Sequence, residues 1–229
     1  MNWPTTAKIN VAIDGPAGAG KSTVARKVAE MLGYIYVDTG AMYRTVTLKA
    51  IREGADLNNS AELARIAERL DVRLVPEPGG QRVLMDGEDV TEPIRSQAVT
   101  GAVSRVAAVP AIRELLVRLQ REIAASRGVV MDGRDIGTNV LPDAEVKVFM
   151  TASVRIRAER RWNEVKDREP STSIESLAEA IAERDKTDSE RDVSPLRQAD
   201  DAVLLDTSHM SADEAAERIV GMCRRALEV

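Results

Sequence analysis

The chain has 229 residues, of which 44% are hydrophobic and 30% charged, and its formal net charge is −5. This length accommodates one sizeable domain, or a core domain that carries a small insert. The acidic balance disfavours non-specific binding to nucleic acid. The single histidine argues against a Ser-His-Asp triad or a histidine-based metal site, and the single cysteine rules out an intrachain disulfide.

No stretch of the chain has the composition of a membrane or secretion signal. The first residues lack a basic start followed by a long apolar run, and no segment approaches about 18 consecutive apolar residues. We therefore expect a cytoplasmic monomer whose partners are small-molecule substrates, with no nucleic acid and no membrane among them.

Short apolar runs and helical patterns alternate along most of the chain. In chain order we expect a strand at 8–14, a helix at 21–32 that stops at Gly33, a strand at 34–38 and a helix at about 40–52. Later come a helix at about 111–126, strands at 128–132, 145–150 and 202–206, and a helix at 211–227. This order predicts an α/β fold with a doubly wound, five-stranded parallel sheet.

The middle of the chain breaks this order. Residues 71–90 alternate apolar and polar side chains around PEPGG and DGED, which are turn sequences. This pattern is typical of an antiparallel hairpin. We therefore expect a small antiparallel β-containing insert at 60–105, and a core formed by residues 1–59 and 106–229.

The stretch from Ile13 to Thr23, IDGPAGAGKST, contains the pattern G-x-x-x-x-G-K-S/T between the first strand and the first helix. Its glycines allow successive backbone N–H groups to face one anion, and the helix N-terminus adds its dipole. Lys21 would reach the β- and γ-phosphates, and the Ser22 hydroxyl would ligate Mg²⁺. The loop predicts binding of a nucleoside triphosphate, but it does not distinguish a switch from a phosphotransferase.

A phosphotransferase also needs a second anion site, for which arginine is suited because its planar fork grips phosphate oxygens. Two groups of polar residues follow strand ends: Asp38, Thr39 and Arg44, then Asp132, Arg134 and Asp135. Ligands of open parallel sheets bind outside the carboxyl ends of the strands. We therefore expect both groups in one crevice with the phosphate loop, with Asp132 organising the waters of Mg²⁺.

Two helical stretches carry further charged residues. Arg184, Asp188 and Arg191 are spaced to project from one helical face, and a second face carries Arg157, Arg160 and Arg161. Structural alternatives remain open at this point. Asp38 or Thr39 can cap a helix, Asp132 and Gly133 can form a turn, and the helical arginines can make surface ion pairs.

Together these motifs resemble the bacterial cytidylate kinases, which are nucleoside monophosphate kinases. The segments IDGPAGAGKST, DTGAMYR, AAVPAIRE, DGRDIGT, FMTASVRIRAERR and ERDKTDSER occur in the family's order and span nearly the whole chain. The resemblance implies transfer of the γ-phosphate of ATP to CMP or dCMP, with Mg²⁺ as cofactor. It also implies that the insert at 60–105 binds the nucleoside monophosphate and that residues at about 153–172 form a short helical lid.

The resemblance assigns roles to individual residues. The expected ATP contacts are Asp14, Gly15, Pro16, Ala17, Gly18, Ala19, Gly20, Lys21, Ser22, Thr23, Arg157 and Arg161. The acceptor phosphate is expected on Thr39, Arg44, Arg134 and Arg191, the cytosine on Ser104, Arg113 and Asp135, and the pentose on Arg184 and Asp188. The metal is expected on Ser22, and on Asp132 through water. The expected catalytic residues are Lys21, Asp132, Arg134 and Arg191, in an in-line transfer without a dedicated general base.

Two other functions compete with this one. A GTP-binding switch is disfavoured because the chain lacks an Asn/Thr-Lys-x-Asp motif for reading guanine. A kinase for another small acceptor would keep the phosphate loop but would not need an insert that carries Ser104 and Arg113. The sequence leaves open the preference between CMP and dCMP and the use of UMP.

Overall fold

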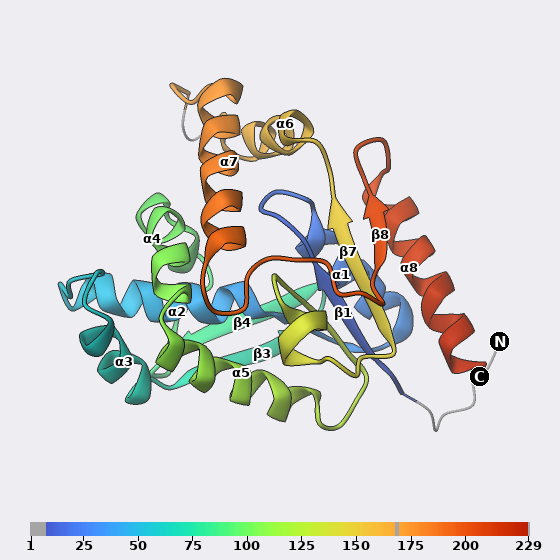
Figure 1. Ribbon diagram of the computed structural model, residues 1–229, viewed down its shortest axis with the longest axis horizontal. Helices are drawn as coiled ribbons and strands as arrows, with labels where there is room; N and C mark the ends of the chain where they lie inside the picture. Colours follow the sequence, from blue (N-terminus) through green and yellow to red (C-terminus); the bar gives the residue numbers. More distant parts are fainter. Residues whose placement is uncertain (1–7, 168–169, 229) are drawn as a thin grey trace.

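The computed structural model describes residues 8–167 and 170–228 (Figure 1). Its main sheet is parallel, with the strand order β2-β6-β1-β7-β8. These strands are β1 (Asn10–Asp14), β2 (Ile35–Asp38), β6 (Val129–Gly133), β7 (Val146–Thr151) and β8 (Val203–Asp206). The predicted five-stranded parallel sheet is confirmed, with strand ends shifted by one or two residues.

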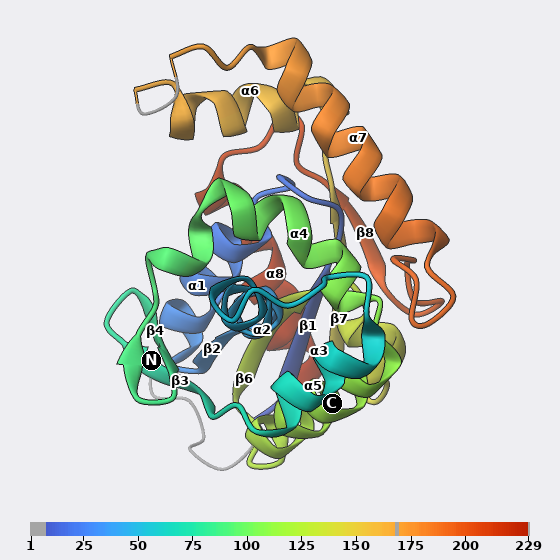
Figure 2. The same ribbon diagram turned by 90° about the vertical axis from the view of Figure 1, so that its left-hand side faces the viewer.

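Helices flank the sheet on both faces (Figure 2). On one face Val11 and Ile13 of β1 belong to an apolar core with α1 (Lys21–Leu32) and α8 (Ala212–Leu227). On the other face Ala12 belongs to a core with α5 (Pro110–Ala124), because successive side chains of a strand point to opposite faces. Burial on both faces explains why the inner strands β1 and β6 are mostly apolar rather than alternating.

The region between α2 (Thr39–Arg52) and α5 contains the predicted antiparallel hairpin. A small sheet is formed by β3 (Val72–Glu77), β4 (Gly80–Met85) and β5 (Glu88–Asp89). Two helices that the sequence analysis does not predict flank it: α3 (Ser60–Glu68) before it, and α4 (Gln97–Ala107) after the short turn η1 (Pro93–Arg95). The predicted insert boundary at residue 105 therefore falls inside α4.

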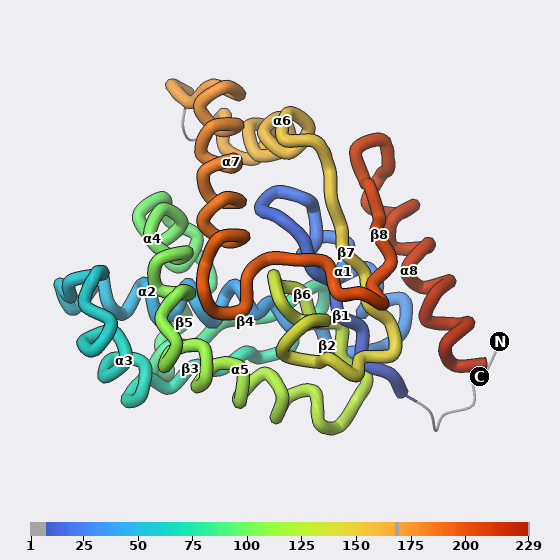
Figure 3. Tube along the Cα trace, in the orientation of Figure 1, coloured from blue at the N-terminus to red at the C-terminus, as the bar shows by residue number. Residues whose placement is uncertain are grey.

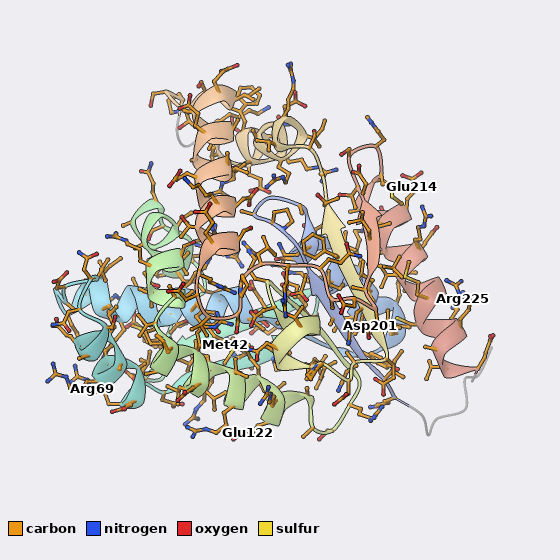
Figure 4. The ribbon with its side chains drawn as sticks, viewed as in Figure 1. Met42, Arg69, Glu122, Asp201, Glu214 and Arg225 are labelled. Atoms are coloured by element: carbon orange, nitrogen blue, oxygen red, sulfur yellow. The ribbon has the colours of Figure 1, made fainter. Side chains whose placement is uncertain are left out.

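Capping residues set the ends of the core helices. α1 ends where predicted, because Gly33 adopts a left-handed φ of 65° that closes the helix. α8 begins after Ser211, whose Oγ accepts a hydrogen bond from Glu214 N (3.2 Å), while the Glu214 carboxylate accepts one from Ser211 N (2.8 Å). Figure 4 shows Glu214 near the start of α8 and Arg225 near its end, where each charge suits the helix dipole.

Helices α6 (Val154–Val165) and α7 (Ile174–Glu190) lie together beyond the carboxyl end of β7 (Figures 1 and 2). The prediction that Arg191 continues the helical face of Arg184 and Asp188 is wrong. Leu196 N donates to the carbonyl oxygen of Asp188 (2.8 Å), so the chain turns back and Arg191 has an extended backbone with ψ of 141°. From there the chain runs across to β8 at the edge of the sheet (Figure 3).

Two of the residues predicted to belong to the lid, 168 and 169, lie outside the described residues. Across 8–167 and 170–228, none of the helices is long and apolar enough to cross a membrane.

Candidate active site

The phosphate loop joins β1 to α1 at the carboxyl end of the sheet. Gly15 has a φ of 149°, and a Cβ placed on it would lie 2.0 Å from the carbonyl oxygen of Met150, so only glycine fits beside β7. Lys21 is buried at the start of α1, and its ammonium donates to the carbonyl oxygen of Pro16 (2.8 Å). Burial, and then the charge of Arg134, lowers the pKa of Lys21.

Asp14 ends β1, and its carboxylate faces the π-helical turn η2 (Ile136–Val140) that follows β6. Its two oxygens accept hydrogen bonds from Ile136 N (2.8 Å) and Gly137 N (2.7 Å). Burial raises the pKa of Asp14 to about 6, although these two hydrogen bonds act in the opposite direction. Asp14 thereby holds in place the segment that carries Arg134 and Asp135.

Ser22 and Asp132 meet at the point where α1 and β6 face each other. Ser22 Oγ donates to Asp132 Oδ2 (2.9 Å), and the Tyr36 hydroxyl donates to Asp132 Oδ1 (2.9 Å). Burial, and then the charge of Asp38, raises the pKa of Asp132. Tyr36 was missed by the sequence analysis because only the register of β2 against β6, in which Tyr36 pairs with Val130, brings its ring to this carboxylate.

A hydroxyl and a carboxylate oxygen side by side match the hard oxygen ligands that Mg²⁺ prefers. Ser22 and Asp132 therefore fit the metal role expected of them. The described part of the chain holds no cluster of three or more His, Cys, Asp or Glu side chains that would bind a metal by itself. A metal here would thus need most of its ligands from bound nucleotide and water, as Mg²⁺ at phosphates commonly does.

A second pocket lies between α2, α4, α7 and the segment after β6. Eight of the residues expected at an acceptor site line it: Thr39, Ser104, Arg113, Arg134, Asp135, Arg184, Asp188 and Arg191. Arg44 is not among them, because its guanidinium donates to Thr100 Oγ1 (2.8 Å) and to the carbonyl oxygen of Ile94 (3.3 Å). Arg44 therefore ties α2 to η1 and to α4, and its charge still acts on Arg184 in this pocket.

Ion pairs organise the pocket. Asp188 Oδ2 accepts from Arg134 Nε (2.9 Å), and Asp188 Oδ1 accepts from Ser104 Oγ (3.1 Å). Burial raises the pKa of Asp188, but the charges of Arg134 and Arg184 lower it further, so the net shift is downward. The pocket thus holds an ionised aspartate of α7 that bonds to α4 and to the segment after β6.

Asp135 is the centre of a second ion-pair group. Arg113 donates to Asp135 Oδ2, and Arg191 Nη2 lies 3.5 Å from Asp135 Oδ1. The guanidinium carbon of Arg113 lies 5.5 Å from the centre of the Tyr43 ring, which also lines the pocket. Tyr43 was not predicted as a site residue, although it lies one turn after Thr39 on α2 and so shares a face with it.

Arg184 also lines the pocket. Among the described residues its Nε has no hydrogen-bond partner. Burial, followed by the charges of Arg134 and Arg44, lowers the pKa of Arg184 to about 9. Arginines held this close together repel one another, so an anion bound here would be stabilised by several positive charges at once.

The three arginines of α6 have different environments. Arg157 is buried and donates to the carbonyl oxygen of Ala17 (2.8 Å) in the phosphate loop, and Arg160 donates to the carbonyl oxygen of Ala19 (3.4 Å). Arg161 pairs with Glu164 (2.9 Å) and is partly exposed. Sequence spacing placed these side chains on one face, but only the tertiary structure shows that two of them support the loop.

The fold and these contacts define a phosphate-loop kinase: a triphosphate loop at the end of a parallel sheet, with an arginine-lined pocket beside it. Comparison with known proteins makes the assignment more specific. The sequence model described as cytidylate kinase matches residues 11–225. The chain is 53% identical over 213 residues to the cytidylate kinase of Bacillus velezensis, covering 93% of this chain and 95% of that one.

A cytidylate kinase from an Exiguobacterium species is 54% identical over 215 residues, with coverage of 93% and 96%. Among solved structures, an uncharacterized protein from Eubacterium ventriosum aligns with a TM-score of 0.51 at 13% identity, over 93% of this chain and 97% of that one, and shares the fold alone. The chain belongs to the cytidylate kinase family.

Proposed function

We propose that the protein transfers the γ-phosphate of ATP to CMP or dCMP, giving CDP or dCDP and ADP. The observation that carries this proposal is the closeness of two cationic sites. The pKa of Lys21 in the phosphate loop is lowered by burial and by the charges of Arg134 and Arg184, which line the second pocket. The two sites are therefore within electrostatic reach of each other, as donor and acceptor phosphates must be.

On the donor side, the loop residues would bind the triphosphate of ATP, with Arg157 and Arg161 contributing from α6. Ser22 would hold Mg²⁺ directly and Asp132 would hold it through water. Bound Mg²⁺ supplies charge neutralisation at the phosphate oxygens. Lys21, released from the carbonyl oxygen of Pro16, would neutralise further charge on the β- and γ-phosphates.

On the acceptor side, Thr39, Arg134 and Arg191 would grip the phosphate of the nucleoside monophosphate, and Arg44 would join them if it leaves Thr100. Arg113, Asp135 and Ser104 would read cytosine, because they combine donors with a carboxylate that accepts from the exocyclic amine. Arg184 and Asp188 would contact the pentose. The lining of one pocket by eight of these nine residues supports the assignment.

The transfer itself needs alignment and charge compensation rather than covalent help from the protein. An oxygen of the acceptor phosphate forms a bond to the γ-phosphorus while the bond from that phosphorus to the β–γ bridging oxygen breaks, and the electron pair stays on ADP. Arg134, near both sites, would stabilise charge that develops between them. Closing of α6 over the loop would exclude water and so limit hydrolysis of ATP.

A coupled assay of ADP release across CMP, dCMP, UMP, AMP and shikimate tests the proposal. We expect turnover with CMP and dCMP to exceed turnover with AMP and shikimate by at least about 100-fold, because the pocket's polar groups would stay unpaired with the wrong acceptor. Equal rates with AMP would contradict the cytosine assignment. Fast hydrolysis without an acceptor, together with strong preference for GTP over ATP, would instead support a switch.

A further inference from the structure

Asp185 of α7 reaches into the phosphate loop. Its Oδ1 accepts a hydrogen bond from the backbone N–H of Ala17 (3.2 Å), and its Oδ2 accepts one from Arg157 Nη1 (2.6 Å). The same Arg157 nitrogen donates to the carbonyl oxygen of Ala17 (2.8 Å). The carboxylate therefore joins α7, α6 and the loop in one closed set of contacts, although Asp185 and Ala17 are 168 residues apart in sequence.

The acceptor pocket is held by the same part of α7. Asp188, three residues after Asp185, bonds to Arg134 (2.9 Å) and Ser104 (3.1 Å), and Arg184 lines the pocket. Residues three apart on a helix lie about one turn from each other and move together, because the backbone hydrogen bonds make the helix stiff. A shift of α7 at the pocket therefore becomes a shift of Asp185 at the loop.

We propose that Asp185 is a positioning residue that couples the donor site to the acceptor site. The inference rests on the proposed function, since it needs a nucleotide in each site. An acceptor bound against Arg134, Arg184 and Asp188 fixes α7, and a fixed α7 holds Asp185 against Ala17 and Arg157. The phosphate loop and α6 are then ordered before ATP arrives, so less entropy is lost when ATP binds.

Coupling between binding sites is reciprocal. If the acceptor raises the affinity for ATP by some factor, ATP must raise the affinity for the acceptor by the same factor. A purely structural ion pair between α6 and α7 would behave differently. Its loss would lower the stability of the fold or weaken each ligand alone, but it would leave the affinity of one ligand independent of the other. The affinity for one ligand measured with and without the other ligand therefore distinguishes a coupling role of Asp185 from a purely structural one.

The experiment measures the dissociation constant of β,γ-imido-ATP with Mg²⁺ by calorimetry, with and without saturating CMP. The ratio of interest is the dissociation constant without CMP divided by the dissociation constant with CMP. In the wild-type protein we expect this ratio to be at least about 5. In Asp185→Ala, which loses both contacts, we expect a ratio of about 1. In Asp185→Asn, whose amide oxygen can still accept from Ala17 N but whose NH₂ group cannot accept from Arg157, we expect an intermediate ratio.

The matched control is Glu183→Gln, which removes an exposed negative charge two residues away on α7. We expect its ratio to equal that of the wild type. A ratio in Asp185→Ala that stays within about twofold of the wild-type value would overturn the proposal, as would a wild-type ratio of about 1.

Hydrogen exchange on the wild-type protein keeps the test independent of whether the variants fold. With CMP alone, the peptide covering Gly15 to Ser22 should exchange more slowly, while peptides from α8, on the far side of α1, should not change. Unchanged exchange of the loop would contradict the coupling. A wild-type chain that turns over CMP without coupled binding contradicts this inference alone. A chain that does not turn over CMP contradicts the proposed function, and coupling is then measured with the acceptor that the assay identifies.

Discussion

Arg134 illustrates how the surroundings of one residue set its task. Its Nε is paired with Asp188 at 2.9 Å, and its charge still contributes to lowering the pKa values of Lys21 on one side and Arg184 on the other. The residue therefore lies electrostatically between the phosphate loop and the second pocket. A cation in that position is better placed to stabilise charge moving between two phosphates than to bind either ligand alone.

Arg134→Ala should accordingly reduce kcat by about 100- to 1,000-fold and change the KM for ATP by less than about threefold, because the lost interaction is strongest in the transition state. Steady-state kinetics with CMP as acceptor would measure this. Arg118→Ala, which truncates an exposed arginine of α5, is the control and should match the wild type. Near-normal turnover in Arg134→Ala would remove this residue from the catalytic set.

Asp14 provides a test by pH, since burial raises its pKa from the ordinary 3.8 to about 6. The folded state then binds a proton more tightly than the unfolded state. Protonated Asp14 therefore adds to the free energy of unfolding. This contribution is fully present below about pH 4 and is lost as the pH rises through about 6. A difference of about 2 pKa units corresponds to about 3 kcal/mol.

Asp14→Asn cannot titrate in this range. Its free energy of unfolding, measured in urea, should therefore rise relative to the wild type by up to about 3 kcal/mol between pH 4 and pH 7. A constant penalty is expected on top, because one acceptor for Ile136 N or Gly137 N is lost, but that penalty does not vary with pH. A difference between the two proteins that stays flat across the range would contradict the raised pKa.

At the scale of elements, the site depends on close approach between backbone segments. The phosphate loop passes directly over the end of β7, and α7 contacts the loop through Asp185 while it lines the pocket through Asp188. Such contacts tolerate little added volume, because interiors are packed at nearly crystalline density. Glycines that look alike in the sequence should therefore respond in opposite ways to the same substitution.

Gly15→Ala should lower the free energy of unfolding by more than about 2 kcal/mol and abolish ATP binding, because the new Cβ would collide with the carbonyl oxygen of Met150. Gly101→Ala lies at an exposed site inside α4, where the new Cβ would meet no neighbouring atom within 4 Å. This substitution should raise the free energy of unfolding by about 0.5–1 kcal/mol. Urea unfolding and calorimetry measure both variants. Equal effects would show that backbone crowding at the loop is unimportant.

At the scale of the whole molecule, a chain of net charge −5 gathers positive charge at one end of its sheet. Lys21, Arg134 and Arg184 all have neighbours of like charge there. Polar groups at this end of the sheet also bond to one another. Lys21 bonds to Pro16, and Ser22 bonds to Asp132. Both residues therefore have protein partners within the fold.

Removing divalent metal should thus separate stability from activity. We expect EDTA to abolish turnover of CMP, since Mg²⁺ would be needed to neutralise the phosphates. The melting temperature of the ligand-free protein should change by less than about 1 °C, unlike that of a domain folded around a structural metal. Calorimetric scans with EDTA or with added Mg²⁺ provide the comparison. A drop of several degrees in EDTA would reveal a structural metal.

Local features of the sequence predicted much of the fold. The sheet strands, the helix 21–32 and the hairpin were visible because apolar periodicity, Gly33 and the turn residues act over a few positions. Helices α3 and α4 were not predicted, because they are short and their apolar faces are identified only by packing against α2 and α5. The helical face assigned to Arg191 failed, because α7 ends at Glu190 and the backbone of Arg191 is extended.

By itself, the sequence determined the five strands of the main sheet, the hairpin and the position of the phosphate loop, since these depend on spacings of a few residues. The tertiary structure alone decided which arginine pairs with which carboxylate, that Tyr36 bonds to Asp132, and that Asp185 contacts Ala17. The reason is physical. These bonds join residues 96 and 168 positions apart, and only strand register and helix packing bring such side chains within 3.2 Å.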